Sequence, residues 1–173
     1  GRENFSQRNK RTDMYIPIIR YAEILLINAE AKAELGILTQ NDLNATVNLL
    51  RNRVEMPEMT MNVPIDPALE ALYPSVSGAL KNVILEIRRE RRVELAFEDH
   101  RFWDVRRWMI AEQEGVMSGA MYGIKIYWIN SSPQEFRYTP YLYENRTFTK
   151  KMYLHPFSTN EVNKGYLIQN PGY

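Results

Sequence analysis

Apolar residues recur at helical spacing over the first part of the chain. One series lies three to four positions apart: Ile18, Ala22, Leu25, Ala29 and Ala33. This spacing predicts a helix that begins near residue 18, because residues three and four apart share one face. Gly36 suits the left-handed cap that ends such a helix. The alanine-rich half, residues 29–33, would let another helix approach closely.

A second helix is predicted to follow, with Thr39 or Asn41 as its N-cap and an end near Met56 and Pro57. Its inner stripe is made by Leu43, Val47 and Leu50. The two helices should form a hairpin, and small residues in the first helix are typical of a tetratricopeptide-like unit. No second copy occurs at a period of about 34 residues, so the sequence alone does not establish a repeat.

Prolines interrupt the next stretch, residues 56–77, which predicts an ordered connector with one helical turn near residues 68–72. A long helix is predicted over residues 79–98, and a bend at His100 leads to a short helix over residues 102–110. After Gly115 the chain is rich in Gly, Tyr, Pro and Asn. It predicts one strand at residues 124–129, a brief extended stretch at residues 152–154 and otherwise long loop.

The stretch from Ile84 to Met109 mixes charges of both signs with large apolar side chains, so it cannot be a freely solvated face. We expect Trp103 and Trp108 to lie in the core. Four charged residues fall at helical steps and form a predicted column in which opposite charges pair: Arg91, Glu94, Glu98 and Arg101.

Two interpretations of this charge pattern compete. The arginine pairs at residues 88–89 and 91–92 could bind nucleic acid, but six interleaved acids would repel phosphate. The alternative is a network of Arg, Glu and Asp buried at a helix–helix joint, where guanidinium groups bind carboxylates through paired hydrogen bonds. The interleaving favours the joint. Such a network fixes register without adding much net stability.

Composition removes several classes of function. The net charge of +1 means that the chain as a whole does not signal a polyanion partner, and the absence of cysteine excludes disulfides and thiolate chemistry within this sequence. No apolar run is long enough to span a membrane.

His100 and His155 are the only histidines and lack a third ligand at metal-site spacing, so neither a metal nor another cofactor is expected. No catalytic motif occurs, and the arginines beside Glu94 and Glu98 would keep these acids ionised, which leaves no general acid.

Aromatic side chains are the better candidates for ligand contact, because sugar rings stack their C–H faces on Trp and Tyr. The alternative is that these aromatics anchor long loops to the helices. The candidates from the loop-rich part are Tyr127, Trp128, Tyr138 and Tyr141.

Residues 90–108, ERRVELAFEDHRFWDVRRW, closely resemble the ERRxELAFExxRxxDLxRW signature of SusD/RagB-type nutrient-binding lipoproteins. Residues 21–31 resemble the helix RxAExxLxxAEA of that family, and residues 153–173 resemble its closing YLxPIPxxEI…QNPGY, although His155 and Phe157 depart from it. The three blocks occur in the family order. The signature residues with an expected structural role are Arg91, Glu94, Phe97, Glu98, Arg101, Asp104, Arg107 and Trp108.

The resemblance implies a mainly α fold of tetratricopeptide-like helical hairpins, with long ordered loops and little β. Residues 1–173 would be a single C-terminal helical domain, made of a polar arm (residues 1–13), a helical core (residues 16–110) and a loop-rich part (residues 111–173). A signal peptide and a lipid-bearing cysteine are expected upstream.

The resemblance also implies a function. The protein would be a non-catalytic nutrient-binding protein, for glycans above all, exposed on the cell outer membrane. It would be attached to that membrane only through the upstream lipid anchor and would act with a SusC-like TonB-dependent transporter. It would not bind nucleic acid. The remaining alternative is a helical-repeat adaptor that binds a peptide or protein partner.

Overall fold

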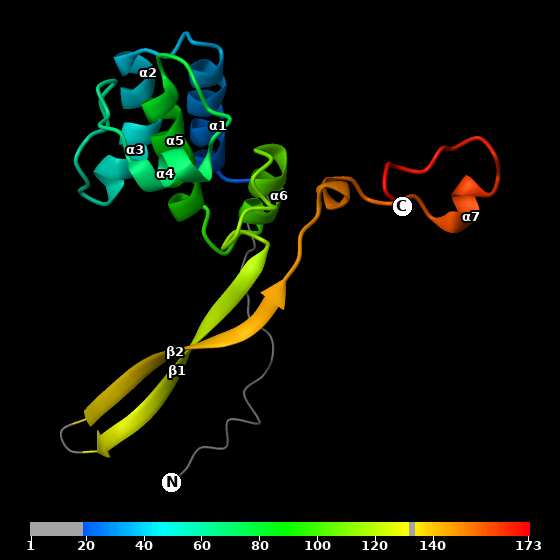
Figure 1. The fold of residues 1–173 in the computed structure, drawn as a ribbon. Coiled ribbons are helices and arrows are strands. Elements are labelled where there is room, and N and C mark those ends of the chain that lie inside the picture. The colour runs from blue at the N-terminus through cyan, green and yellow to red at the C-terminus, as the bar shows by residue number, and fades with distance from the viewer. Residues whose placement is uncertain (1–18, 132–133) are drawn as a thin grey trace, which may run out of the picture.

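The computed structural model describes residues 19–131 and 134–173, so the predicted polar arm at residues 1–13 lies outside the described residues. Helices α1 to α6 form one body, from which a two-stranded hairpin projects on one side and a C-terminal arm on another (Figure 1). The helical body therefore carries two extensions that share little of its core.

Helix α1 (Tyr21–Glu34) confirms the first predicted helix. Its apolar stripe is buried, with Leu26 and Ala29 fully inaccessible to solvent. Gly36 follows with a positive φ of 71°, the conformation that glycine adopts most readily. The main neighbour of α1 is α5 (Lys81–Glu94), which runs beside it in Figure 1. Small side chains such as Ala29 let the two helices pack closely.

The second predicted helix is split into α2 (Gln40–Asn44) and α3 (Val47–Arg53). Thr39 caps α2, because its hydroxyl accepts the Asp42 N–H while the Asp42 carboxylate accepts the Thr39 N–H at 2.9 Å. Thr46 leaves the helical region of backbone conformation and separates α2 from α3. The second helix of the expected hairpin is therefore broken into two short ones, and α1 packs on α5 as well as on α3.

Side-chain hydrogen bonds hold the proline-rich connector on the body. Buried Asn48 accepts the Met59 N–H at 2.7 Å and donates to the Met59 carbonyl at 3.0 Å. The predicted helical turn is α4 (Pro67–Leu72), capped by Asp66, whose carboxylate accepts the Ala68 N–H at 2.9 Å. The proline-rich connector is therefore ordered, as predicted.

Helix α5 ends at Glu94, four residues before the predicted end. Phe97 and Asp99 have positive φ values of 65° and 62°, and α6 (His100–Arg107) starts immediately after them. Left-handed residues end an α-helix, so the chain turns here instead of continuing. The turn brings α6 back against the side of α5 and α1.

The structure corrects the predicted fold class of a mainly α protein with little β. Strands β1 (Gly119–Ser131) and β2 (Gln134–Arg146) are each 13 residues long and pair antiparallel from Gly119↔Arg146 to Ser131↔Gln134. Only the middle of β1 was expected. Residues 134–146 were predicted as loop, yet β2 holds Pro140 at its centre, because both strands are edges, where a residue without an N–H is tolerated.

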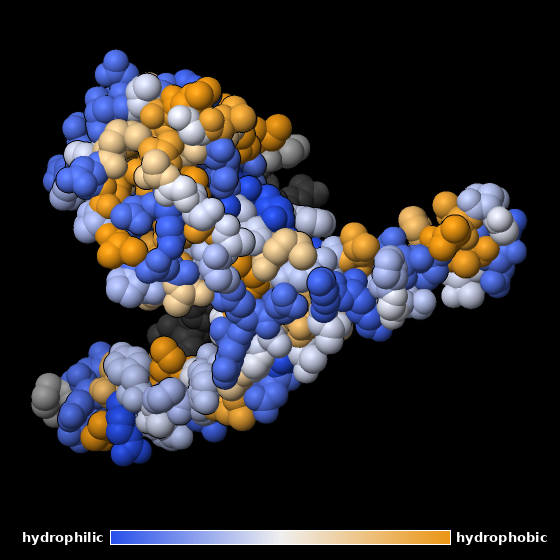
Figure 2. Space-filling view, turned by 45° about the horizontal axis from the view of Figure 1, so that its top comes forward, coloured by the Kyte–Doolittle hydropathy of each residue, from blue (hydrophilic) through white to orange (hydrophobic). Residues whose placement is uncertain are grey.

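The C-terminal arm holds a 3-10 turn, η2 (Lys150–Tyr153), and a short helix, α7 (Thr159–Val162). The expected extended stretch at residues 152–154 is therefore wrong, since η2 occupies most of it. Figure 2 shows apolar side chains gathered at the outer end of this arm and on the helical body. Much of the arm makes no contact with the main core.

Candidate functional site

The family-like stretch lies at the joint between α5 and α6. Asp104 of α6 is buried, and its two carboxylate oxygens share the Nε–H of Arg91, at 2.8 and 3.0 Å. It also accepts Nε of Arg107 at 2.9 Å. Arg91 and Asp104 are both almost fully buried, so each neutralises the charge of the other at a place that solvent hardly reaches. This pair fixes the angle at which α6 returns against α5.

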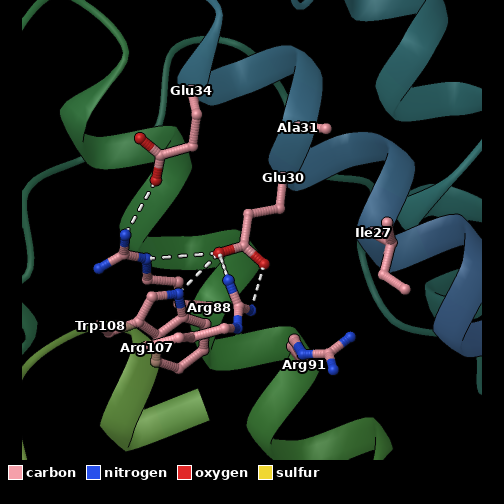
Figure 3. Close-up of a pocket in the computed structure, with 8 residues that line it drawn as sticks. All are labelled: Ile27, Glu30, Ala31, Glu34, Arg88, Arg91, Arg107 and Trp108. Carbon is pink, nitrogen blue, oxygen red and sulfur yellow. Dashed lines mark hydrogen bonds and ion pairs between the residues drawn. The ribbon is translucent and has the colours of Figure 1, made fainter. Parts of the chain in front are cut away.

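Glu30 of α1 joins the same network from the opposite side. Its carboxylate accepts both Nη groups of Arg107, at 2.7 and 2.6 Å, and the indole N–H of Trp108 at 2.7 Å. Arg88 of α5 lies 3.9 Å away. Figure 3 shows this carboxylate at the centre of the group, with the cations of α5 and α6 around it. One buried acid therefore ties three helices together.

The charges at this joint hold Glu30 ionised. Burial alone would raise the pKa of the Glu30 carboxyl, but hydrogen bonds and charge from Arg107, the Trp108 N–H and the charge of Arg88 outweigh it and lower that pKa below its usual range. Burial likewise opposes the charged form of Arg107, and Glu30 with Asp104 reverses this and raises its pKa. Neither group is poised to exchange a proton near neutral pH.

Arg88 is buried between aromatic rings. Its Cζ lies 4.8 Å from the ring centre of Trp108 and 5.1 Å from that of Tyr73, while Nη2 donates to Glu34 at 2.9 Å. A hollow of 490 Å³ opens beside this group, lined by Ile27, Glu30, Ala31, Glu34, Arg88, Arg91, Arg107 and Trp108. Both of its carboxylates are paired with arginine, so it offers no general acid. The arrangement suits a structural joint.

The predicted column of alternating charges does not form. Because α5 ends at Glu94, the members of the column are separated, and each has a partner elsewhere. Arg91 binds Asp104, and Glu94 binds Arg20 and Arg53. Glu98 binds Arg20, and Arg101 donates to the Tyr73 hydroxyl at 3.3 Å.

Two aromatic residues of the stretch lie on the surface. Trp108 is buried as expected, but Trp103 is 60% exposed and Phe97 is fully exposed at its positive φ. The expectation that Trp103 lies in the core is therefore wrong. The reason is the early end of α5, which turns this side of the segment outward.

The structure places all four candidate ligand aromatics on the projecting hairpin, but on opposite faces. Cross-strand partners point to the same side of a sheet, and successive residues alternate. Trp128 and Tyr138 belong to an apolar face, on which Trp128 packs against Phe136 with ring centres 5.5 Å apart. The apolar face consists of Tyr122, Ile124, Ile126, Trp128, Phe136, Tyr138, Pro140 and Leu142.

Tyr127 and Tyr141 lie on the other side, here named the cationic face, which consists of Gly123, Lys125, Tyr127, Arg137, Thr139 and Tyr141. Nζ of Lys125 is 4.7 Å from the ring centre of Tyr141, and Cζ of Arg137 is 5.2 Å from that of Tyr127. The Tyr141 ring lies across Gly123, where an added Cβ would come within 2.8 Å of it. All four predicted aromatics therefore cannot contact one saccharide on a single face.

Sequence reasoning missed Glu30, Lys125 and Arg137. Glu30 had a signal, since it is an acid inside the buried stripe of α1, between Leu26 and Ala33. Lys125 and Arg137 had no such signal until β2 was known, because only the register of β2 shows that they share a face.

The described residues contain no group of three or more His, Cys, Asp and Glu side chains that could hold a metal ion. Within the same residues no helix is both long and apolar enough to cross a bilayer.

Comparison with known proteins decides the family. The model of the SusD family matches residues 2–173, almost the whole chain. The chain belongs to the SusD family. Members of this family are in general non-catalytic nutrient-binding proteins that work with a TonB-dependent transporter in the SusC/SusD system and are typically associated with the outer membrane.

SusD-like protein P2 of Formosa agariphila is 40% identical over 93 residues. The aligned part covers 54% of this chain and 16% of that protein. No solved structure matches the chain. Membership of the SusD family therefore rests on the sequence, while the geometry of the joint and the hairpin comes from this structure.

Proposed function

We propose that this SusD-family chain belongs to a cell-surface protein that captures a nutrient glycan without cleaving it and delivers it to a TonB-dependent outer-membrane transporter. A lipid anchor upstream of residue 1 would attach it to the outer membrane. The single observation that carries the glycan-binding part is the cationic face of the hairpin. It presents the two tyrosines, Thr139 and two cations on a projecting and accessible surface.

This chemistry suits capture. Tyrosine rings and hydroxyls match the apolar C–H faces and hydroxyls of sugars, and the face lacks a pair of carboxylates set to work as acid and base. Of the two tyrosines, Tyr127 is 44% exposed and Tyr141 is partly buried against Gly123. We assign the main sugar contact to Tyr127.

The apolar face supports a protein contact. Its seven non-proline side chains are between 37% and 70% exposed, and an exposed apolar strip of this length marks a surface that another protein covers. A two-stranded sheet is also marginally stable without such cover. We assign this face to the transporter, so that the hairpin would bind the partner on one side and the glycan on the other.

The test is calorimetric titration of the complete protein with oligosaccharides. We expect saturable binding that Tyr127→Ala weakens at least about ten-fold, which corresponds to the loss of one aromatic contact of about 1.5 kcal/mol. Tyr21→Ala is the matched control, because Tyr21 is 69% exposed on α1, away from the hairpin. Equal loss in both variants, or none in either, would refute the assigned face.

A further inference from the structure

The cationic face carries positive charge without a nearby acid in its middle. Lys125 and Arg137 both lie on it, and Lys125 pairs with Thr139 while Arg137 pairs with Tyr127, so the two cations are diagonal neighbours. The only acids of the two strands are Glu135 near the tip, which accepts the Asn130 amide at 3.3 Å, and Glu144 near the base, which binds Arg146. The charge of this face is therefore uncompensated between its ends.

The tyrosines hold these cations in place. Lys125 lies over the Tyr141 ring and Arg137 over the Tyr127 ring, and each contact reduces the freedom of a long side chain that would otherwise move widely in solvent. A cation fixed before binding loses less entropy when a ligand arrives. The face therefore presents two positioned cations on residues that lie about 7–8 Å apart, as diagonal neighbours of an antiparallel pair do.

We propose that the glycan bound by this face is acidic, with carboxylate or sulfate groups that pair with Lys125 and Arg137. This inference rests on the proposed glycan-binding function and specifies its substrate class. Two cations set diagonally across one face match a polymer whose acidic groups repeat, and the hydroxyls of the two tyrosines and Thr139 remain for the hydroxyls of the sugar. A neutral glycan would leave both cations without an anionic partner.

A purely structural role for the two cations makes a different prediction. If Lys125 and Arg137 only stabilised the hairpin by covering the tyrosine rings, their removal would lower hairpin stability and affect all saccharides alike. If they bind anions, their removal lowers affinity for acidic saccharides alone and reduces the salt dependence of binding.

The complete protein is screened against an array of neutral and acidic polysaccharides. It is then titrated with matched pairs of probes. Oligogalacturonate and its methyl ester test the carboxylate, and κ-carrageenan oligosaccharide and its desulfated form test the sulfate. We expect at least one acidic probe to bind about ten-fold tighter than its neutral form, as for hydrogen bonds to charged groups. Lys125→Gln with Arg137→Gln should abolish that preference, and Lys125→Arg with Arg137→Lys should restore it.

Lys151→Gln is the matched control, because Nζ of Lys151 lies 4.7 Å from the Tyr173 ring centre, the same contact made outside the hairpin. This variant should bind as the wild type does. Equal affinity for acidic and neutral forms, unchanged in the double glutamine variant, would overturn the acidic class and leave glycan capture intact. Failure to bind any saccharide of the array would overturn the proposed function and this inference with it.

Discussion

The carboxylate of Glu30 accepts the indole N–H of Trp108 at 2.7 Å across 78 positions of sequence. The same carboxylate accepts both Nη groups of Arg107, so one acid of α1 satisfies three donors from the end of α6. Glu30 and Trp108 are buried, whereas the Arg107 side chain is 44% exposed. The stability of the joint should therefore depend on this side chain more than on any exposed pair.

Glu30→Ala should lower the free energy of unfolding of the complete protein by about 1–3 kcal/mol, because it leaves the buried indole N–H of Trp108 without its acceptor and removes the pair with Arg107. Urea denaturation measures this change. Glu70→Ala is the control, since Glu70 is 41% exposed and its pair with Lys81, which is also partly exposed, should contribute no more than about 1 kcal/mol. Equal effects of the two substitutions would contradict the central role of Glu30.

Arg91 and Asp104 should be strongly coupled. Either Arg91→Ala or Asp104→Ala leaves one buried charge unpaired and should cost about 3–5 kcal/mol, whereas the double variant should cost less than their sum. Glu94→Ala should cost less than either, because Glu94 and its partners Arg20 and Arg53 are more accessible to solvent. A double-mutant cycle from denaturation curves measures the coupling, and additive effects would show that the pair is not a unit.

Stability should decline in acid through Glu30. The folded state lowers the pKa of this carboxyl, so its contribution is complete above the unfolded value of about 4.3 and is lost as the pH falls through the lower folded value. The melting temperature measured between pH 6 and pH 3 should fall less steeply in Glu30→Gln, which cannot titrate at this position. Parallel curves for wild type and variant would assign the acid sensitivity to other groups.

The apolar face of the hairpin should lie against the transporter in cells. A photo-crosslinking residue in place of Ile126, which is 61% exposed at the centre of this face, should give an adduct with the transporter. The same residue in place of Lys151 on the C-terminal arm serves as the control. An adduct formed only within the protein's own chain would show that the face is covered internally, contrary to the proposal.

Gly123→Ala should disturb ligand binding without removing any ligand contact. The added Cβ would meet the Tyr141 ring at 2.8 Å, so the ring must move and with it the support of Lys125. We expect weaker saccharide binding by calorimetry with an unchanged melting temperature of the helical body. Gly165→Ala, where an added Cβ has open space but φ is +84°, controls for a general effect of glycine replacement. If Gly123→Ala binds as the wild type does, the ring does not position the cation.

The helical periods of α1 and of the later helices were predictable because apolar spacing records which face is buried. The partners of the charged residues were not predictable, because they depend on where a helix stops. Phe97 takes a left-handed conformation that its residue type does not signal, Asp99 takes one that aspartate adopts more readily, and four residues of predicted helix were lost there. The column of charges depended on the missing turn.

The hairpin shows a second limit of reading a sequence locally. Strand β1 had a recognisable alternation, which already separates Tyr127 from Trp128, but the residues that join them on each face come from β2, which was predicted as loop. Only the register of β2 places Tyr141 with Tyr127 and Tyr138 with Trp128. The aromatic character was visible in the sequence, and the pairing of aromatics across two strands was not.

Capture without turnover is tested most directly by equilibrium dialysis of the complete protein against an oligosaccharide pool, followed by chromatographic sizing of the sugar. We predict that the protein retains sugar, that Tyr127→Ala retains much less, and that the retained chains keep their original length. Shortened chains, or retention no greater than that of a buffer blank, would contradict this prediction.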